Sequence, residues 1–177
     1  MKLVALLVLV ACGASRYEET TATWTRHATM RGQFQEALDV DAIFKSADWR
    51  TAHAERDADN RGLTGAERDA VIAQAKADMA GPYEVEMLVT TWDRGENDLD
   101  RGKKSVWRVV LVDDAGKEIE PLEIVKDKRR PTTLRAEFPS LNDFAVAYIA
   151  RFPHQDHPLR LRMSSERGGV EVRWEAN

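Results

Sequence analysis

A short segment near the C-terminus, bracketed by Pro153 and Pro158, holds the densest group of side chains that could do chemistry. It contains two imidazoles and one carboxylate, from His154, Asp156 and His157. Imidazole and carboxylate groups are ligands for transition metals. The spacing matches no zinc signature, so a polar loop between two strands stays open as the alternative. The sequence therefore predicts a candidate metal site at 154–157.

An acidic segment at residues 93–100 is a second candidate site. Its carboxylates come from Asp93, Glu96, Asp98 and Asp100. Carboxylate oxygens bind calcium, although this segment lacks the EF-hand spacing. A solvated connection between two strands is the alternative interpretation, so the segment is a candidate calcium site on ligand type alone.

A basic segment precedes Pro131, with Asp127 as its single acidic member. Its cationic side chains are those of Lys126, Lys128, Arg129 and Arg130. Such a group can contact anionic headgroups at a membrane surface, where each basic residue adds about 1 kcal/mol. An ordinary charged turn is the alternative.

Signatures of catalysis and of nucleic-acid binding are missing from the sequence. It contains no nucleophile elbow, no phosphate-binding loop, no dinucleotide-binding glycine motif and no H-E-x-x-H zinc motif. The net charge of −4 argues against a general nucleic-acid binder, which needs a basic excess. Paired carboxylates for glycoside hydrolysis stay open, because their separation cannot be read from a sequence. A non-enzymatic protein without a cofactor is therefore expected, with a hydrolase ranked below ligand binding.

The first residues, MKLVALLVLVACGAS, form a distinct N-terminal segment. Lys2 provides a positive start, Leu3 to Val10 are all apolar, and Leu9-Val10-Ala11 leads directly into Cys12. The apolar run is far shorter than the ~20 residues that span a membrane. A charged start, a short apolar core and a small-residue cleavage site describe a secretory signal. With the cysteine in this place, the segment resembles a bacterial lipoprotein signal with its lipobox; an ordinary signal peptide or a short uncleaved anchor is the alternative.

This resemblance implies removal of residues 1–11 and lipidation of Cys12, which is the single cysteine and so cannot form an internal disulfide. Several acyl chains hold a protein stably at a membrane, whereas one holds it marginally. Gly13 follows the cysteine where an Asp would imply inner-membrane retention, so the resemblance implies the outer membrane, facing the periplasm or the exterior. Residues 12–20 are then a lipidated cysteine and a short tether, and we expect Leu3 to Val10 to make few contacts with the domain.

The remaining chain, residues 21–177, has the length of one domain. Alternating patterns predict strands at 21–30 and 38–44. Residues 47–80 instead favour a helical hairpin on the surface, with a capping box formed by Thr64 and Glu67 and an end at Gly81-Pro82.

Strand patterns return after the helical hairpin. They cover residues 83–89, 106–112, 119–125, 132–138, 159–163 and 170–174. Residues 141–152 fit a helix or a strand, and the flanking Pro139 and Pro153 favour the strand. About nine short strands with regular turns predict a mainly β fold, an antiparallel β-sandwich of the immunoglobulin-like or a similar kind, with a barrel as the alternative. Trp24, Trp107 and Trp174 lie in strand patterns and are expected in the core or at its rim.

Together these features predict a membrane-anchored lipoprotein of the bacterial cell envelope. It would act as a non-enzymatic interaction or structural module at the membrane surface, with an envelope protein as a further partner and the helical hairpin or the loops as the contact surface. The alternative is a ligand- or metal-binding lipoprotein that uses the 93–100 or the 154–157 loop.

Overall fold

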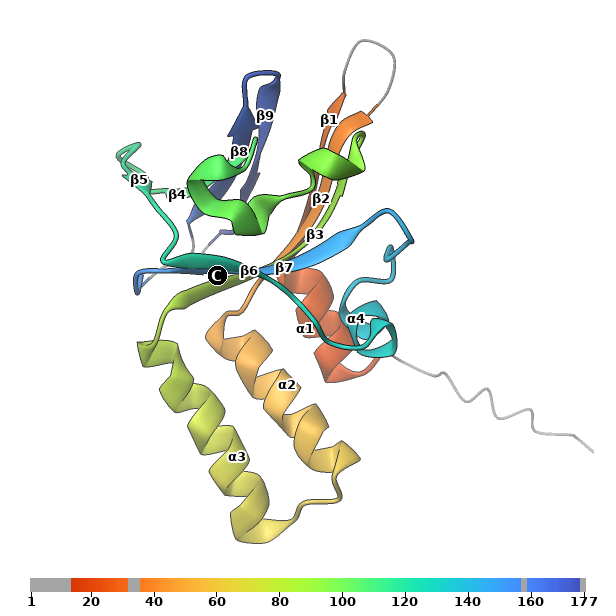
Figure 1. Ribbon diagram of the computed structural model, residues 1–177. Coiled ribbons are helices and arrows are strands. Elements are labelled where there is room, and N and C mark those ends of the chain that lie inside the picture. The colour runs from red at the N-terminus through yellow and green to blue at the C-terminus, as the bar shows by residue number, and fades with distance from the viewer. Residues whose placement is uncertain (1–13, 32–35, 157–158, 176–177) are drawn as a thin grey trace, which may run out of the picture.

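A computed structural model describes residues 14–31, 36–156 and 159–175 of the 177-residue chain. Within these ranges the chain forms nine strands in two antiparallel sheets, together with four α-helices and three short 3₁₀ helices (Figure 1). The expectation of a mainly β, sandwich-like fold with about nine strands is therefore confirmed at this level.

The larger sheet has five strands. In spatial order they are β1 (Thr25–Arg31), β2 (Glu36–Phe44), β3 (Tyr83–Thr91), β7 (Val146–Phe152) and β6 (Glu123–Lys126). The smaller sheet has four, β5 (Glu118–Ile119), β4 (Arg108–Val112), β8 (Arg160–Ser165) and β9 (Gly168–Arg173). An immunoglobulin-like order is not confirmed, because β1, β2 and β3 are consecutive neighbours here, whereas an immunoglobulin sheet interleaves strands distant in sequence.

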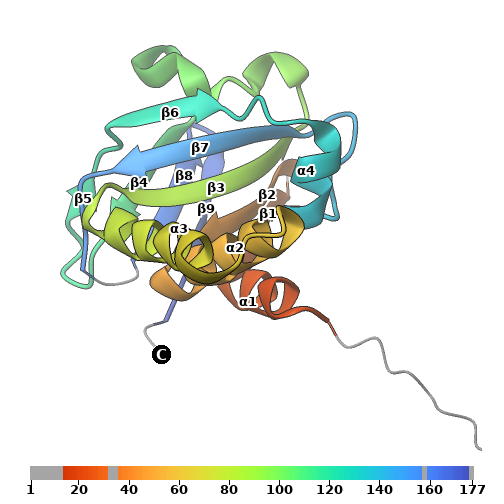
Figure 2. The same ribbon diagram turned by 90° about the horizontal axis from the view of Figure 1, so that it is seen from below.

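The main core lies between the two sheets. Side chains alternate across a strand, so Val85 and Met87 of β3 share one face and are fully buried. On this same face the Tyr83 hydroxyl accepts a hydrogen bond from the Leu159 backbone N–H at 3.0 Å, next to β8. The opposite face of β3 carries Glu84 and Glu86, and the helices cover it (Figure 2).

Four helices accompany this sheet. They are α1 (Arg16–Trp24), α2 (Ala47–Asn60), α3 (Gly65–Ala77) and α4 (Pro131–Glu137). Figure 2 shows α1, α2 and α3 crossing the sheet and α4 at one end of β7. Among the described residues, no helix combines the length and the apolar character that crossing a membrane requires.

The helical hairpin is confirmed in α2, α3 and the 3₁₀ turn η1 (Asp78–Ala80). Helix α2 buries Trp49 and Ala52, whereas α3 has no buried residue and projects from the sheet (Figure 1). The hairpin thus lies on the surface, as its thin apolar stripe predicted. The capping box expected at Thr64 is wrong, because the Thr64 side chain makes no capping hydrogen bond.

The N-terminal strand prediction and the tether are wrong in part. The predicted strand at 21–30 begins only at Thr25, and the predicted tether at 12–20 is helical from Arg16. The reason is a capping box at the start of α1, which Ser15 and Glu18 form. Tyr17, Thr21 and Trp24 then share one buried helical face, which a short alternating pattern can mimic.

The strand predicted at 132–138 is also wrong, since this segment forms most of α4. Pro131 occupies the first helical position, where its fixed φ favours a helix and its missing N–H costs nothing. Leu134 and Phe138 are buried, so the helix is held by its packing. The strand favoured for 141–152 is confirmed only from Val146 onward, as β7, and the burial of the three tryptophans is confirmed.

Candidate functional site

The start of α1 joins the N-terminal segment to the folded domain. Ser15 Oγ accepts a hydrogen bond from the Glu18 backbone N–H at 3.3 Å, and the Ser15 N–H donates to Glu18 Oε2 at 2.7 Å. Cys12 lies outside the described residues, three positions before Ser15. Three residues span about 10 Å at most. A lipid on Cys12 would therefore hold the start of α1 within that distance of the membrane.

Helix α1 is fixed to α2 at this end. The ring of Tyr17 is almost fully buried, with its centroid 6.0 Å from that of Trp49. The guanidinium of Arg56 lies 4.3 Å from the centre of the Tyr17 ring, a cation–π contact. Arg16 Nη1 is 2.5 Å from Glu55 Oε2. These contacts join the first turn of α1 to α2, at its first turn through Trp49 and at its second half through Glu55 and Arg56.

Helix α4 adjoins the same end of α2. A pocket of about 340 Å³ is lined by residues of both helices. They are His53, Arg56, Asp57 and Asn60 from α2 and Thr132, Thr133, Ala136 and Glu137 from α4. The first turns of α1 and α4 and the end of α2 thus form one surface, which we call the attachment face.

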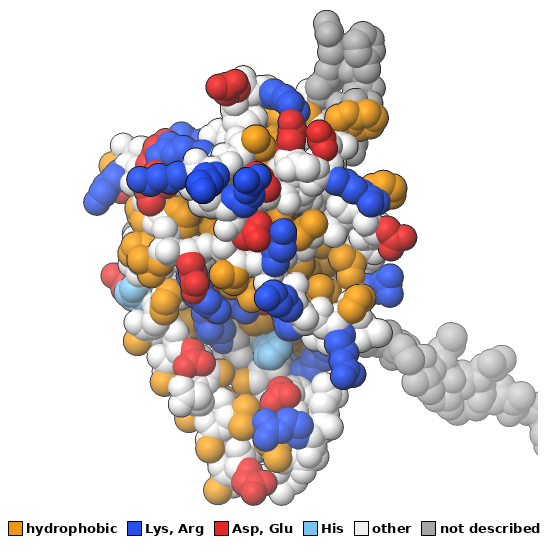
Figure 3. Space-filling view, viewed as in Figure 1, with side chains coloured by type: hydrophobic (Ala, Val, Ile, Leu, Met, Phe, Trp, Pro, Cys, Tyr) orange, Lys and Arg blue, Asp and Glu red, His pale blue; other side chains and the backbone are white. Residues whose placement is uncertain are grey.

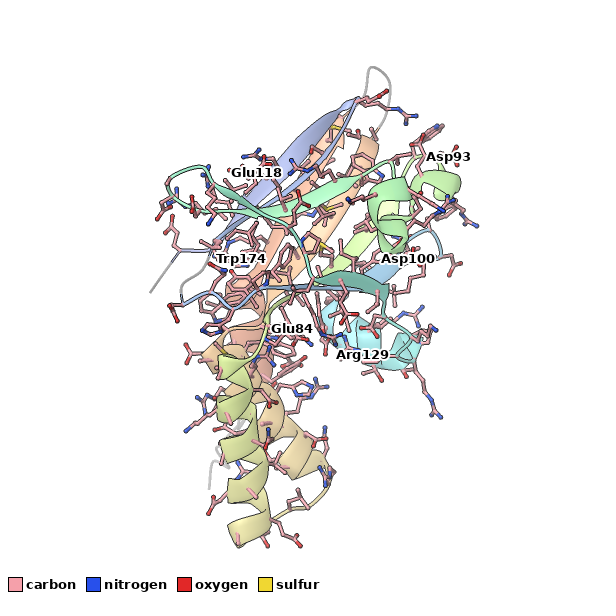
Figure 4. The ribbon with its side chains drawn as sticks, turned by 60° about the vertical axis from the view of Figure 1, so that its left-hand side comes forward. Glu84, Asp93, Asp100, Glu118, Arg129 and Trp174 are labelled. Carbon is pink, nitrogen blue, oxygen red and sulfur yellow. The ribbon has the colours of Figure 1, made fainter. Side chains whose placement is uncertain are left out.

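A buried charged cluster ties α4 to β3, with Arg129 at its centre (Figure 4). Arg129 donates from Nη1 to Glu137 Oε1 and from Nη2 to Glu137 Oε2, each at 2.8 Å. Its Nη2 also lies 2.9 Å from Glu86 Oε2 and 2.6 Å from Asp127 Oδ2. The side chains of all three acids are almost fully buried. One guanidinium therefore neutralises charges from β3, α4 and the loop between β6 and α4.

Lys45 completes the cluster, with its Nζ 2.6 Å from Glu86 Oε1. Burial would raise the pKa of Glu86, but a hydrogen bond with Glu137 and the charges of Lys45 and Arg129 lower it to about 2. Burial, together with Glu86, instead raises the pKa of Glu137 to about 7. Burial and the charge of Lys45 lower the pKa of His53, which stacks on Trp49. The cluster thus holds one carboxyl that binds a proton near neutral pH.

The basic segment predicted as a membrane contact is divided by the structure. Arg129 pairs with the acids of the buried cluster, and its side chain is 30% exposed. Lys126 Nζ lies 3.4 Å from Asp100 Oδ1. Lys128 and Arg130 are exposed. Figure 3 shows basic and acidic side chains interspersed over the face seen in Figure 1, in keeping with this local pairing.

The acidic segment 93–100 folds into two 3₁₀ turns, η2 (Arg94–Glu96) and η3 (Leu99–Lys104), with Asp93 and Asp100 on different turns (Figure 4). Its carboxylates have protein partners. Asp93 accepts from the Gly95 N–H, Glu96 pairs with Arg167, Asp98 accepts from Ser105 Oγ, and Asp100 pairs with Lys126. Within the described ranges, no group of three or more His, Cys, Asp or Glu residues could hold a metal ion.

The candidate metal loop at 154–157 is only partly described. His154 Nδ1 donates to the Gly81 carbonyl oxygen at 2.9 Å, and His154 Nε2 lies 3.1 Å from Asp156 Oδ1. His157 lies outside the described residues. The structure therefore brings His154 and Asp156 together and does not place the third predicted ligand.

Sequence reasoning missed the buried cluster. Glu84 and Glu86 alternate with apolar residues on β3, a pattern typical of a solvent-exposed face. One signal was available: Glu86 and Glu137 lie within the strands predicted at 83–89 and 132–138, where a buried and unpaired charge is costly. That signal names no partners, because the pairing depends on which helices cover the sheet.

No protein-family model and no curated protein matches this chain. Among solved structures, it shows similarity to a novel protein of unknown function from Burkholderia pseudomallei K96243. The two share 11% sequence identity and a TM-score of 0.40, over 90% of this chain and 82% of that chain. A similarity of this size carries no argument about function.

Proposed function

We propose that this protein is a lipid-anchored lipoprotein of the bacterial cell envelope, acting as a non-enzymatic interaction or structural module at the membrane surface. The observation that supports it most is the short distance between the lipobox cysteine and the folded domain. Ser15 already caps α1, so two residues, Gly13 and Ala14, separate Cys12 from the N-cap of the first helix. Such a domain rests on its membrane and does not extend from it on a stalk.

This placement gives the attachment face a role. Lys128 and Arg130 belong to the loop that enters α4 and are exposed, and within the described part of the chain no ion pair engages them. Near an anionic surface each such residue contributes about 1 kcal/mol of attraction. These side chains then orient the anchored domain toward anionic headgroups.

The same placement at the membrane also has a consequence for the helical hairpin. Helix α3 contributes no residue to the core and projects beyond the sheet (Figure 1). With the start of α1 at the membrane, the exposed side of α3 stays available to another envelope protein. The hairpin is the contact surface that we propose for a partner.

Fractionation of the bacterial envelope tests the anchor. The full chain should enter the membrane fraction and take up a labelled fatty acid, whereas Cys12→Ser should lose the label and leave the membrane fraction. Ala14→Ser adds the same hydroxyl group two positions away and should keep both properties. Membrane retention of an unlabelled wild-type chain would refute lipidation.

A ligand-binding lipoprotein is the second candidate function. One observation favours it: Leu99, from the acidic segment, lines a pocket of about 780 Å³. Small-molecule sites fall in the range of roughly 300–1,000 Å³ and are mostly apolar.

A further inference from the structure

The pocket lies where elements of both sheets meet. Its wall is built from η3, β4, the residues that enter β6, and the end of β8. The chain passes here from β5 in the smaller sheet to β6 in the larger one, through Glu120 and Pro121. The pocket is therefore formed jointly by elements of both sheets and not by a single loop.

The inside of the pocket is apolar. Leu99, Trp107 and Val109 line it and are otherwise buried, and Ile124 is half-buried beside them. Val106 also lines the pocket and is 47% exposed. Apolar surface in contact with water costs roughly 25 cal/mol per Å², so an apolar ligand gains free energy where it covers Val106 and Ile124.

A second pocket adjoins the first at Val106 and Trp107. This second pocket, of about 380 Å³, shares Ser105, Val106, Trp107 and Ser165 with the first. At its far end Arg167 pairs with Glu96. Two adjacent pockets on either side of shared residues offer a longer path for a ligand than one pocket alone, which suits a chain better than a compact ring.

The charged side chains at the rim of the pocket indicate which head group a ligand with an apolar chain would carry. Arg108 is neutralised locally, with Nη1 2.6 Å from Glu118 Oε2 and Nη2 2.5 Å from Glu120 Oε1. Lys103 also lines the pocket and is exposed, and no ion pair engages it within the described part of the chain. Among the described residues that line the rim, Lys103 is therefore the cation available to a ligand.

We infer that this pocket binds a single-chain amphiphile with an anionic head, the chain lying against Val106 and Ile124 and the head meeting Lys103. A fatty acid and a lysophospholipid share this chemistry. The inference deepens the second candidate function and rests on it, but it does not require the lipid anchor.

The test measures binding of palmitate to the full chain carrying Cys12→Ser, purified without detergent, by isothermal titration calorimetry. Lysophosphatidylglycerol with the same acyl chain is a parallel probe that distinguishes a lipid source from a free fatty acid. Hexadecanol, which lacks a charge, reports on the apolar interior alone. We expect saturable binding of one or both anionic amphiphiles at one site per chain, and weaker binding of hexadecanol.

Two exposed positions allow variants that leave the core intact. Lys103→Glu should weaken binding of the anionic amphiphiles about tenfold or more, since a hydrogen bond between charged groups is lost and repulsion is added. Its matched control is Lys104→Glu, the same change at the next residue, which does not line the pocket. Val106→Trp should fill the space and abolish binding, whereas Leu122→Trp, also exposed and outside the pocket lining, should not.

Equal losses in Lys103→Glu and Lys104→Glu would overturn the inference, as would palmitate binding that survives Val106→Trp. Hexadecanol binding that Val106→Trp blocks, without any preference for an anionic head, would also overturn it while leaving a ligand-binding protein in place. Failure of all three probes to bind would remove both the inference and the second candidate function.

Discussion

Arg129 holds Glu137 through two parallel hydrogen bonds of 2.8 Å, and the same guanidinium lies 2.9 Å from Glu86 on β3. Paired hydrogen bonds of this kind fix direction as well as charge. Through them a seven-residue helix, α4, is held at the end of the larger sheet, next to the start of α1. The buried cluster therefore builds the attachment face without belonging to its surface.

Replacement of Arg129 by Met should destabilise the domain. It leaves Glu86, Asp127 and Glu137 buried with Lys45 as the remaining cation of the cluster. Breaking a buried pair on one side costs about 3 kcal/mol or more. Urea unfolding should show this loss, whereas Arg130→Met at the neighbouring exposed position should change stability by less than about 0.5 kcal/mol. Equal effects of the two substitutions would contradict the structural role of Arg129.

The stability of the domain should depend on pH through Glu86 and Glu137. Glu137 has a pKa near 7 in the folded protein and an ordinary value of 4.5, so the folded state holds the additional proton between these values. The stabilisation that Glu137 gives the folded state is present below pH 4.5 and is lost as the pH rises toward 7. Glu86 has a lowered pKa of about 2, so its contribution is lost as the pH falls from 4.5 toward 2.

The Glu137→Gln variant isolates the first of these effects. Gln can donate to Glu86 as a protonated Glu137 does, but it cannot ionise. We expect the loss of stability between pH 5 and pH 7.5 to be smaller in this variant than in the wild type. His53 has a lowered pKa and acts in the opposite direction below pH 6.5, and its effect cancels in the comparison. An unchanged pH profile, with Glu19→Gln as the exposed control, would count against a shared proton.

The capping box of α1 should contribute to stability. Ser15→Ala removes the side chain that accepts from the Glu18 N–H and should cost about 1 kcal/mol. Thr64 occupies the equivalent position before α3 without a capping hydrogen bond, so Thr64→Ala should cost clearly less. Chemical unfolding of both variants makes the comparison, and faster hydrogen exchange in the first turn of α1 should accompany the Ser15 loss.

Gly13 should influence which membrane carries the protein. The lipoprotein resemblance implies outer-membrane export with Gly at this position and inner-membrane retention with Asp. Gly13→Asp should therefore move the lipidated protein to the inner membrane, as density-gradient separation of the two membranes would show. Gly13→Asn is the control, because Asn is nearly the same size as Asp but carries no charge. Unchanged location in both variants would contradict the sorting prediction.

Local sequence patterns were sufficient for several elements. The helical hairpin at 47–80 and the strands β8 and β9 were predicted because the residues that make up each pattern are adjacent in the chain. For β7 the bracketing prolines decided between two fitting patterns. Segments as short as α1 and α4 fit both the helix and the strand periodicity. In these two segments the helix caps and the tertiary packing determined that a helix forms.

The sequence by itself determined a lipobox-like N-terminus, a chain rich in short antiparallel strands and a surface helical hairpin, because each depends on neighbouring residues. The tertiary structure alone decided that Glu86, Arg129 and Glu137 meet, and that Leu99, Val106 and Lys103 line one pocket. Glu86 and Glu137 are 51 positions apart and belong to a strand and a helix. Such contacts depend on which surfaces the folded chain brings together, a property that no local pattern contains.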